Sequence, residues 1–439
     1  MKVSHALRAL RSRNYRLFVA GQLVSLIGTW MQMVAQAWLI YRLTGSAVLL
    51  GVAGFAAQIP VFVLAPLGGV IADRLDRRRV LIVAQSAMMV LALVLAALTF
   101  TEIVQVWQIF TLAALLGVAN AFDIPARQSF VIQMVGRDDL PNAIAINSGM
   151  VNGARLVGPA VAGAIVAVVG EAWCFLINGT SYVGVIAALM LMQVPGEGNA
   201  PRAAISAWAS VVEGFTFSWH TRPIRALLLL LGLVSLMGMP YTVLMPIFAD
   251  RVLGGGPYAY GFLMSAAGLG ALAASGLLTM RRSLSGLGQW IAMSAAGFGV
   301  CLLFFSISRS LWLSAALLVP AGFFMILGMA ASNTLIQAMV PDRLRGRVMA
   351  VYSMMFMGMA PVGALLAGAL AAPVGAPATV AFGGAACLAG GLVFGAHLPS
   401  IRGAARQLIA AQQMTAGAPP DEAQLAQPYA SGPAPNQSQ

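Results

Sequence analysis

Charged residues are scarce in this chain of 439 residues: they make up 9% of it, while hydrophobic residues make up 60%. A soluble domain typically carries about 25% charged residues, so this composition excludes an ordinary soluble protein and indicates a membrane protein. The net charge of +12 comes from short arginine clusters between apolar segments. That distribution argues against nucleic-acid binding and favours contact with anionic lipid headgroups.

Residues and motifs that carry chemistry are scarce as well. The three histidines are isolated, and the three cysteines lie far apart without the spacing of metal ligands, so we expect no metal and no cofactor. The chain contains no P-loop, no GxGxxG after a strand and no HExxH. These absences argue against an ATP-driven pump. They also argue against an enzyme, which would need His, Asp or Ser clustered at one depth.

Long apolar runs make up most of the chain. A spanning helix needs about 20 apolar residues. We expect twelve such helices, near 15–41, 47–72, 80–101, 104–127, 142–169, 172–194, 226–249, 258–280, 287–307, 311–335, 347–372 and 376–398. The sequence therefore predicts an all-α membrane protein with twelve transmembrane helices.

Similar segments recur at one offset and indicate an internal repeat. QLVSLIG at 22–28 returns as GLVSLMG at 232–238, and 117–135 matches 322–340 in length, both offset by about 205–210 residues. We predict two parallel six-helix repeats. The expected organisation is an N-terminal half at 1–194, a linker with an amphipathic helix at 195–225, a C-terminal half at 226–402 and a disordered tail at 403–439.

The distribution of basic residues predicts the orientation. With a cytoplasmic N-terminus, only Arg42, Arg251 and Arg309 would lie in outer loops. Arg127 and Arg155 would lie within helices, and the other 20 of the 25 basic residues would be cytoplasmic. Cytoplasmic loops carry an excess of Lys and Arg, so we expect both termini and the linker on the cytoplasmic side.

Several expected helices carry polar residues along one face, at steps of three and four. In lipid such faces line a wet cavity or bond to neighbouring helices, and both readings stay open for a single residue. We favour a cavity wall for the first helix, because five polar residues exceed what packing needs. The expected substrate cavity comprises Gln22, Ser25, Thr29, Trp30, Gln32, Gln36, Asn120, Asp123, Asn152, Arg155, Asn333 and Gln337.

The charged stretch GGVIADRLDRRR at 68–79 must be a tight turn between two membrane helices. Its spacing resembles the pattern G-x-x-x-D-R-x-G-R-R of the major facilitator superfamily, with Asp76 where the pattern has Gly. The resemblance implies a conformational switch made of Gly69, Asp73, Arg74, Arg77 and Arg78. In relatives the acid at the position of Asp73 faces the start of helix 11, so we expect Asp73 to hold the cytoplasmic side shut.

Further stretches resemble one branch of that superfamily, the exporters related to the enterobactin exporter and to macrolide and tetracycline efflux pumps. They are NYRLFVAGQLVSLIGTWM, FDIPARQSF, NGARLVGP and VPDRLRGRVMA, and the resemblance covers roughly residues 10–400. Gly158, Pro159 and Gly163 look like a degenerate helix 5 motif of antiporters, which implies a kink; plain helix packing is the alternative. Ala113 stands where many proton-coupled members carry an arginine.

The resemblance implies the major facilitator fold in a bacterial inner membrane. It also implies a monomer that exports a small amphipathic molecule, such as a drug, a lipophilic metabolite or a siderophore, by alternating access with protons. The alternatives are an importer of a polar nutrient or, in another class, a membrane-embedded enzyme or receptor.

Arg155 stands apart from the other candidates because it is expected near mid-bilayer. Either it bridges to Asp123 as a structural tie, or it faces the cavity and meets an anionic part of the substrate.

Overall fold

The computed structural model describes residues 8–192, 207–280 and 283–415, and at 73, 137, 207–211 and 413–415 it describes the backbone only. Across these ranges the chain is helical without strands, and twelve helices are long and apolar enough to cross a membrane. This confirms the predicted all-α fold with twelve spans.

The first half of the chain provides six spans. A short 3-10 helix, η1 (Arg8–Arg11), precedes α2 (Arg13–Thr44), α3 (Ala47–Arg74), α4 (Arg77–Phe100), α5 (Val106–Val169) and α6 (Glu171–Leu191). α5 contains two spans that are separated at Gly136. The φ of Gly136 is 72°, in the left-handed region that favours glycine, so this residue permits the break between the two spans.

The second half provides the other six spans, preceded by the short helix α7 (Ala207–His220). One span is built from α8 (Arg222–Leu233), α9 (Tyr241–Ile247) and two π-helical turns, η2 (Val234–Gly238) and η3 (Phe248–Val252). The next three spans are α10 (Gly256–Met280), α11 (Leu287–Ile307) and α12 (Leu311–Met339). The last two are α13 (Asp342–Ser353) with η4 (Met354–Gly358) and α14 (Met359–Val374), and then α15 (Ala376–Thr415).

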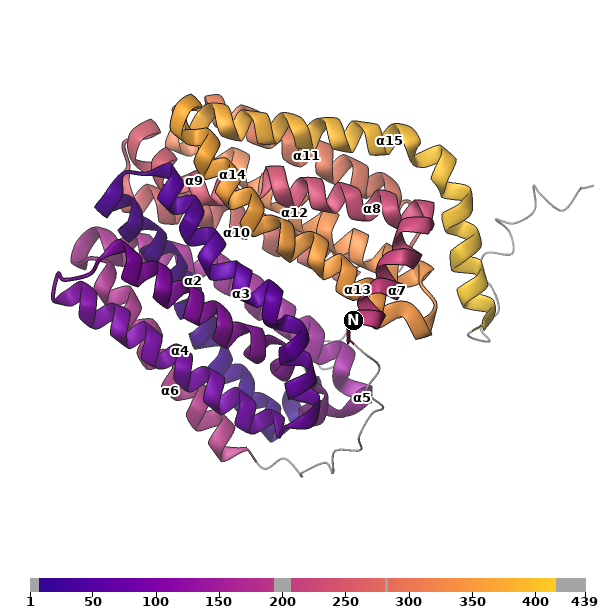
Figure 1. Ribbon diagram of the computed structural model, residues 1–439, viewed down its shortest axis with the longest axis horizontal. Helices are drawn as coiled ribbons and strands as arrows, with labels where there is room; N and C mark the ends of the chain where they lie inside the picture. The colour runs from indigo at the N-terminus through magenta and orange to yellow at the C-terminus, as the bar shows by residue number, and fades with distance from the viewer. Residues whose placement is uncertain (1–7, 193–206, 281–282, 416–439) are drawn as a thin grey trace, which may run out of the picture.

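Successive spans place their loops alternately at two ends of the helix bundle. We call one the basic end: it holds both ends of the described chain, helix α7 and most of the arginines, with turns near 75, 137, 221, 283 and 341. We call the other the opposite end, with turns near 45, 103, 170, 254, 309 and 375. Figure 1 shows the two halves side by side, the first in indigo to magenta and the second in pink to yellow.

Glycine-mediated crossings join the two halves. The second span of α5 crosses α10, where a side chain added to Gly163 or Gly261 would collide with the backbone of the other helix. α3 crosses α14 in the same way through Gly51 and Gly368. Since α3 and α10 occupy corresponding positions in the two repeats, the two joints correspond as well.

The apolar core shows where the halves are in contact. The largest cluster combines residues of both halves, such as Trp38 and Leu50 with Leu244 and Phe248, and it lies toward the opposite end. At the basic end the cores are separate. One contains residues of the second half together with α7, and the other contains residues of the first half alone.

Several helix boundaries differ from expectation. Helix α13 begins at Asp342 rather than near 347, because the charged turn itself is helical. Helix α15 continues to Thr415, so the segment 403–415 of the predicted tail is helical, as its Ala, Gln and Leu content favours. The predicted linker segment 195–206 and the tail from 416 lie outside the described residues.

The predicted amphipathic helix of the linker is α7. Val212, Phe215 and Trp219 are exposed on one face, whereas Gly214 and Ser218 are buried on the other. The exposed apolar face suits a helix that lies along the membrane surface.

Candidate functional site

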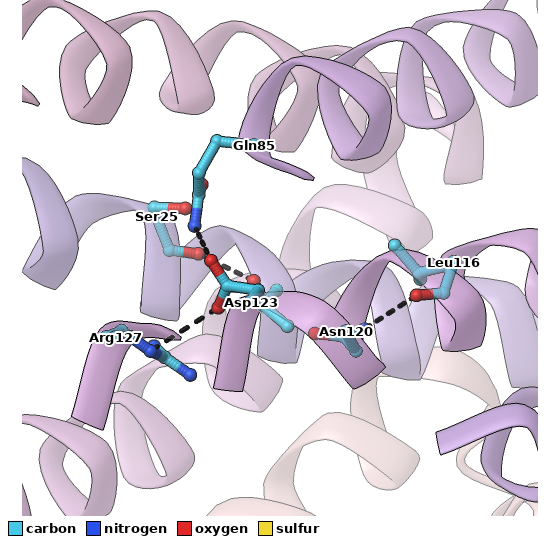
Figure 2. Close-up of polar contacts among 7 residues, drawn as sticks. Ser25, Gln85, Leu116, Asn120, Asp123 and Arg127 are labelled. Atoms are coloured by element: carbon cyan, nitrogen blue, oxygen red, sulfur yellow. Dashed lines mark hydrogen bonds and ion pairs between the residues drawn. The ribbon is translucent and has the colours of Figure 1, made fainter. Parts of the chain in front are cut away.

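A buried carboxylate lies inside the first half. Asp123 on α5 is 2% exposed, and its oxygens face Gln85 of α4 at 2.8 Å (Nε2 to Oδ1) and Arg127 at 3.4 Å (Nε to Oδ2). Figure 2 shows Gln85 and Arg127 reaching Asp123 from two sides, with Ser25 of α2 beside the cluster. Asp123 and Arg127, four residues apart on one helix, therefore form an ion pair, and the side chain of Arg127 remains 23% exposed. Asn120, one turn away, donates to the carbonyl of Leu116 in its own helix.

The polar face of α2 lies mainly against other helices of the first half. Gln22, Ser25 and Gln32 are buried, while Thr29 and Gln36 are half-buried. The side-chain oxygen of Gln32 accepts a 2.6 Å hydrogen bond from Asn178 of α6. This bond has the geometry of interhelical packing, the alternative reading of the stripe; the cavity role of these five residues stays a prediction.

Arg155 lies on α5, beside Trp30 of α2. Its guanidinium carbon is 4.9 Å from the centroid of the Trp30 ring, a cation–π geometry. The Nε and Nη1 atoms are buried and have no hydrogen-bond partner among the described residues. Within the same ranges Arg155 forms no ion pair, so this conformation does not contain the alternative bridge to Asp123.

The helix 5 motif lies in the joint between the halves. Gly158 lies so close to α2 that an added side chain would meet Trp30, and Gly163 packs on Gly261 of α10. Pro159 is buried beside the same glycine, Gly261, with its carbonyl oxygen facing α10. About two turns toward the basic end, Asn152 donates a 3.0 Å hydrogen bond to Ser275 of α10. These contacts agree with the packing interpretation of the motif, and its predicted kink stays a prediction.

Two polar residues of the second half bond to each other. The Nε2 of Gln337 donates to the Oδ1 of Asn333 at 2.6 Å on α12. A small cavity of about 30 Å³ lies in the same half, and its wall is mainly apolar and includes Met239, Met325 and Phe356. Flexible Met side chains adapt to varied apolar shapes, so this wall suits the apolar part of a ligand.

Polar contacts also connect the two halves at the opposite end. The Tyr41 hydroxyl donates a 2.6 Å hydrogen bond to Asp250, and Arg251 donates to the carbonyl of Gly45 at 3.1 Å. The rings of Trp38 and Tyr260 stack at 6.3 Å between centroids. We call these six residues the opposite-end lock.

The turn 68–79 connects α3 and α4 at the basic end. Arg78 donates to the carbonyl of Met190 on α6, and Arg77 donates to the carbonyl of Ala72 at 3.3 Å. Arg74 is exposed, and an added side chain at Gly69 would meet nothing within 4 Å. The side chain of Asp73 is not among the described side chains. The switch role of these residues is untested by the contacts.

The linker helix α7 contacts α13, which begins the eleventh span. Glu213 of α7 forms ion pairs with Arg343 and Arg347 of α13, the closer one with Arg347. An added side chain at Gly214 would meet the carbonyl of Arg347 at 2.6 Å, so the two helices are in close contact.

Comparison with known families decides the class of protein. A family described as transmembrane secretion effector, a branch of the major facilitator superfamily, matches residues 4–427. The chain belongs to this family. The predicted recognition as a major facilitator transporter is thus confirmed, and with it a multi-pass membrane transporter with a small-molecule substrate.

The relatives of this transporter include the staphyloferrin A transporter of Staphylococcus aureus, 25% identical over 80% of this chain and 88% of that one. The multidrug efflux pump Tap of Mycolicibacterium fortuitum is 29% identical over the same shares. A solved bacterial homologue of the human lysosomal transporter Spinster is similar at a TM-score of 0.67 and 15% identity, covering 92% of this chain and 98% of that one. That likeness confirms the major facilitator fold.

The predicted cavity residues of the transporter bond to different partners, and their role as one substrate cavity stays a prediction. Asp123 and Gln32 bond within the first half, Asn152 bonds across the halves, and Asn333 bonds within the second half. No group of metal-ligating side chains is found within the described ranges. The relatives are transporters, which is consistent with a chain that is not an enzyme.

Sequence reasoning missed Gln58 and Gln85. Gln58 is exposed on α3 between Gly54 and Phe62, two residues that contact the other half, so it lies on the surface where the halves face each other. The signal available for both was a lone amide in a long apolar run, which is unusual in lipid.

Proposed function

We propose that this transporter exports a small amphipathic molecule across the bacterial inner membrane by alternating access, and that the described conformation is open to the cytoplasm. The observation that carries the proposal is the distribution of the core. One apolar cluster joins both halves at the opposite end, whereas the clusters at the basic end belong to single halves. A joint at one end and separation at the other is what a rocking pair of repeats requires.

The orientation of this proposal rests on arginine. The basic end carries most of the basic residues, and an excess of these residues marks the cytoplasmic side of membrane proteins. Both termini and α7 would then be cytoplasmic. The direction of transport is supported by the relatives, since one of them is named a multidrug efflux pump.

Proton coupling would require a titratable group within the membrane, and Asp123 is the natural candidate. Of the thirteen acids in the sequence, the others lie in turns, within a few residues of the ends of the twelve spans, in the linker or in the tail. Asp123 is buried well inside a span, and its partner Arg127 is partly exposed. Protonation of Asp123 would free Arg127, which couples a proton to a rearrangement of charge. We therefore propose Asp123 as the proton-carrying residue of a monomeric transporter.

The test is a flux measurement in everted membrane vesicles, with tetracycline and ethidium as probes. We expect acidification of the vesicle interior to drive uptake of at least one probe, and an uncoupler to abolish it. Asp123→Asn should abolish gradient-driven uptake while thermal stability stays near that of the original protein. Asp139→Asn is the matched control, because Asp139 pairs with Arg8 near the basic end. Absence of gradient-driven uptake of both probes, or full uptake by Asp123→Asn, would contradict the proposal.

A further inference from the structure

Arg155 is a cation in the middle of a span and has no ion-pair partner among the described residues. It lies 17 residues after Asp138 and 14 before Val169, the ends of its span. At 1.5 Å per residue these separations are about 26 Å and 21 Å, so Arg155 lies far from both membrane surfaces. An arginine at that depth is costly and needs a partner.

The described surroundings of Arg155 compensate its charge only in part. The Trp30 ring faces the guanidinium at 4.9 Å, which offsets some of the charge. The Nε and Nη1 atoms nevertheless have no acceptor among the described residues. Asp123, which lies inside the other span of α5, is bonded to Gln85 and Arg127 instead.

A second unsatisfied group lies on the helix that crosses α5 at this point. Gly268 of α10 packs against the backbone carbonyl of Arg155. Ser265, one turn earlier on α10, has a buried hydroxyl without a partner in the described part of the chain. Since Gly261, Ser265 and Gly268 follow one another at helical spacing, Ser265 lies on the α10 face that meets α5.

The site is therefore built from both halves of the transporter. Trp30 and Arg155 belong to the first half and Ser265 to the second. A ligand held between them would contact both halves at their joint. The contacts of such a ligand would change when one half moves against the other, as those of a transported substrate must.

From these contacts we infer that Arg155 and Ser265 bind the carboxylate of an amphipathic organic anion whose body packs on Trp30, and that this anion is the transported substrate. A guanidinium presents several donors in one plane and prefers carboxylate oxygens as acceptors. The indole ring gives an aromatic or apolar body a surface to pack on. The claim that the anion is transported rests on the proposed export function, whereas the claim that it binds does not.

Binding to the purified full-length protein tests the inference, with rhodamine B and its ethyl ester as probes, because they differ only in the carboxylate. We expect rhodamine B to bind at least about tenfold more tightly, the effect of a hydrogen bond to a charged group. Arg155→Gln should remove that preference and leave the affinity for the ester unchanged. Arg402→Gln, an exposed arginine near the basic end, is the control and should keep the preference.

Thermal unfolding of each variant separates binding from folding. If Arg155→Gln fails to fold, Arg155→Lys decides, because it keeps the charge and loses the planar fork. We expect it to retain part of the preference. Equal binding of the two probes to the original protein, or absence of binding of both, would overturn the inference. So would a preference that survives in folded Arg155→Gln, or one that stays at full size in Arg155→Lys. Rhodamine B binding without gradient-driven flux of either probe would instead count against the export function and leave the carboxylate site standing.

Discussion

Asp76 shows how a departure from a sequence pattern acquires a local role. It stands where the superfamily pattern has glycine, and it caps the N-terminus of α4. Its carboxylate accepts from the backbone N–H of Arg78 and Arg79. An acid at a helix N-terminus satisfies free N–H groups and complements the helix dipole. The substitution thus stabilises the turn from within and leaves the neighbouring arginines free to bond to α3 and α6.

Gly68 and Gly69 are neighbours with different surroundings, and they give a matched prediction. A side chain at Gly68 would meet the carbonyl oxygen of Ala121 at 2.0 Å, whereas one at Gly69 would meet nothing within 4 Å. Gly68→Ala should therefore lower thermal stability, by an overpacking cost of about 1–3 kcal/mol. Gly69→Ala should keep or slightly raise it, since alanine favours a helix by about 1 kcal/mol.

Export should then distinguish the two glycines. If Gly69 belongs to the switch, its small size is needed when the basic end closes, so Gly69→Ala should export poorly despite normal stability. Export is measured as uptake into everted vesicles, and stability by thermal unfolding of the purified protein. Normal export by Gly69→Ala would remove Gly69 from the switch. An equal loss of stability in both variants would contradict the packing argument.

Individual residues show what the sequence could and could not predict about the site. The pair Asp123–Arg127 followed from a spacing of four residues on one helix, so it was predictable. The partners Gln85 of Asp123 and Asn178 of Gln32 come from other helices. Each is a single amide in an apolar run, without a periodic pattern, so nothing local indicates which helix it faces.

At the scale of elements, the spans were predictable because length and apolarity alone define them. The ends of the helices were less predictable where the sequence contains no stop signal. The segment after 402 has no glycine or proline between Ala404 and Thr415, and α15 continues through it. Likewise Asp342 begins α13 directly after Pro341, a helix start that the charge-rich turn concealed.

The contact between α7 and α13 leads to a prediction at this scale. Glu213 is 44% exposed, and exposed ion pairs contribute only about 0–1 kcal/mol, even with two arginines nearby. Glu213→Gln should hence loosen α7 only slightly. Gly214→Ala should loosen it more, because its side chain would collide with the backbone of α13.

Hydrogen–deuterium exchange of the peptide 207–220 measures this difference. We expect strong protection in the original protein, slightly faster exchange in Glu213→Gln and much faster exchange in Gly214→Ala. Exchange in a peptide from α11 serves as the internal control and should stay constant. A larger effect of Glu213→Gln than of Gly214→Ala would show that charge rather than close packing holds α7.

At the scale of the whole molecule, the repeat makes the two halves act as opposed bodies. Glycine crossings join them at the side, and the opposite-end lock joins them at one end. Under the proposed orientation, the lock closes the outer side of the transporter. Its polar contacts must break when the transporter opens outward, so they set part of the balance between the two states.

Tyr41→Phe tests the lock because it removes one hydroxyl and preserves the ring. The lost 2.6 Å bond to Asp250 ends on a carboxylate that is exposed to solvent, so we take a net value of about 1 kcal/mol for it. That value corresponds to roughly a fivefold rise in the outward-open population.

Labelling of a cysteine buried beneath the lock measures the shift. Leu50→Cys, 3% exposed here, is introduced into a protein whose Cys174, Cys301 and Cys387 have been replaced. A membrane-impermeant maleimide applied from outside should react about fivefold faster when Tyr41→Phe is added, within the free energy of one such bond. Tyr258→Phe is the matched control, because Tyr258 lies at the same end, is 59% exposed and is not part of the lock. An unchanged labelling rate in Tyr41→Phe would mean that the apolar cluster alone holds this end shut.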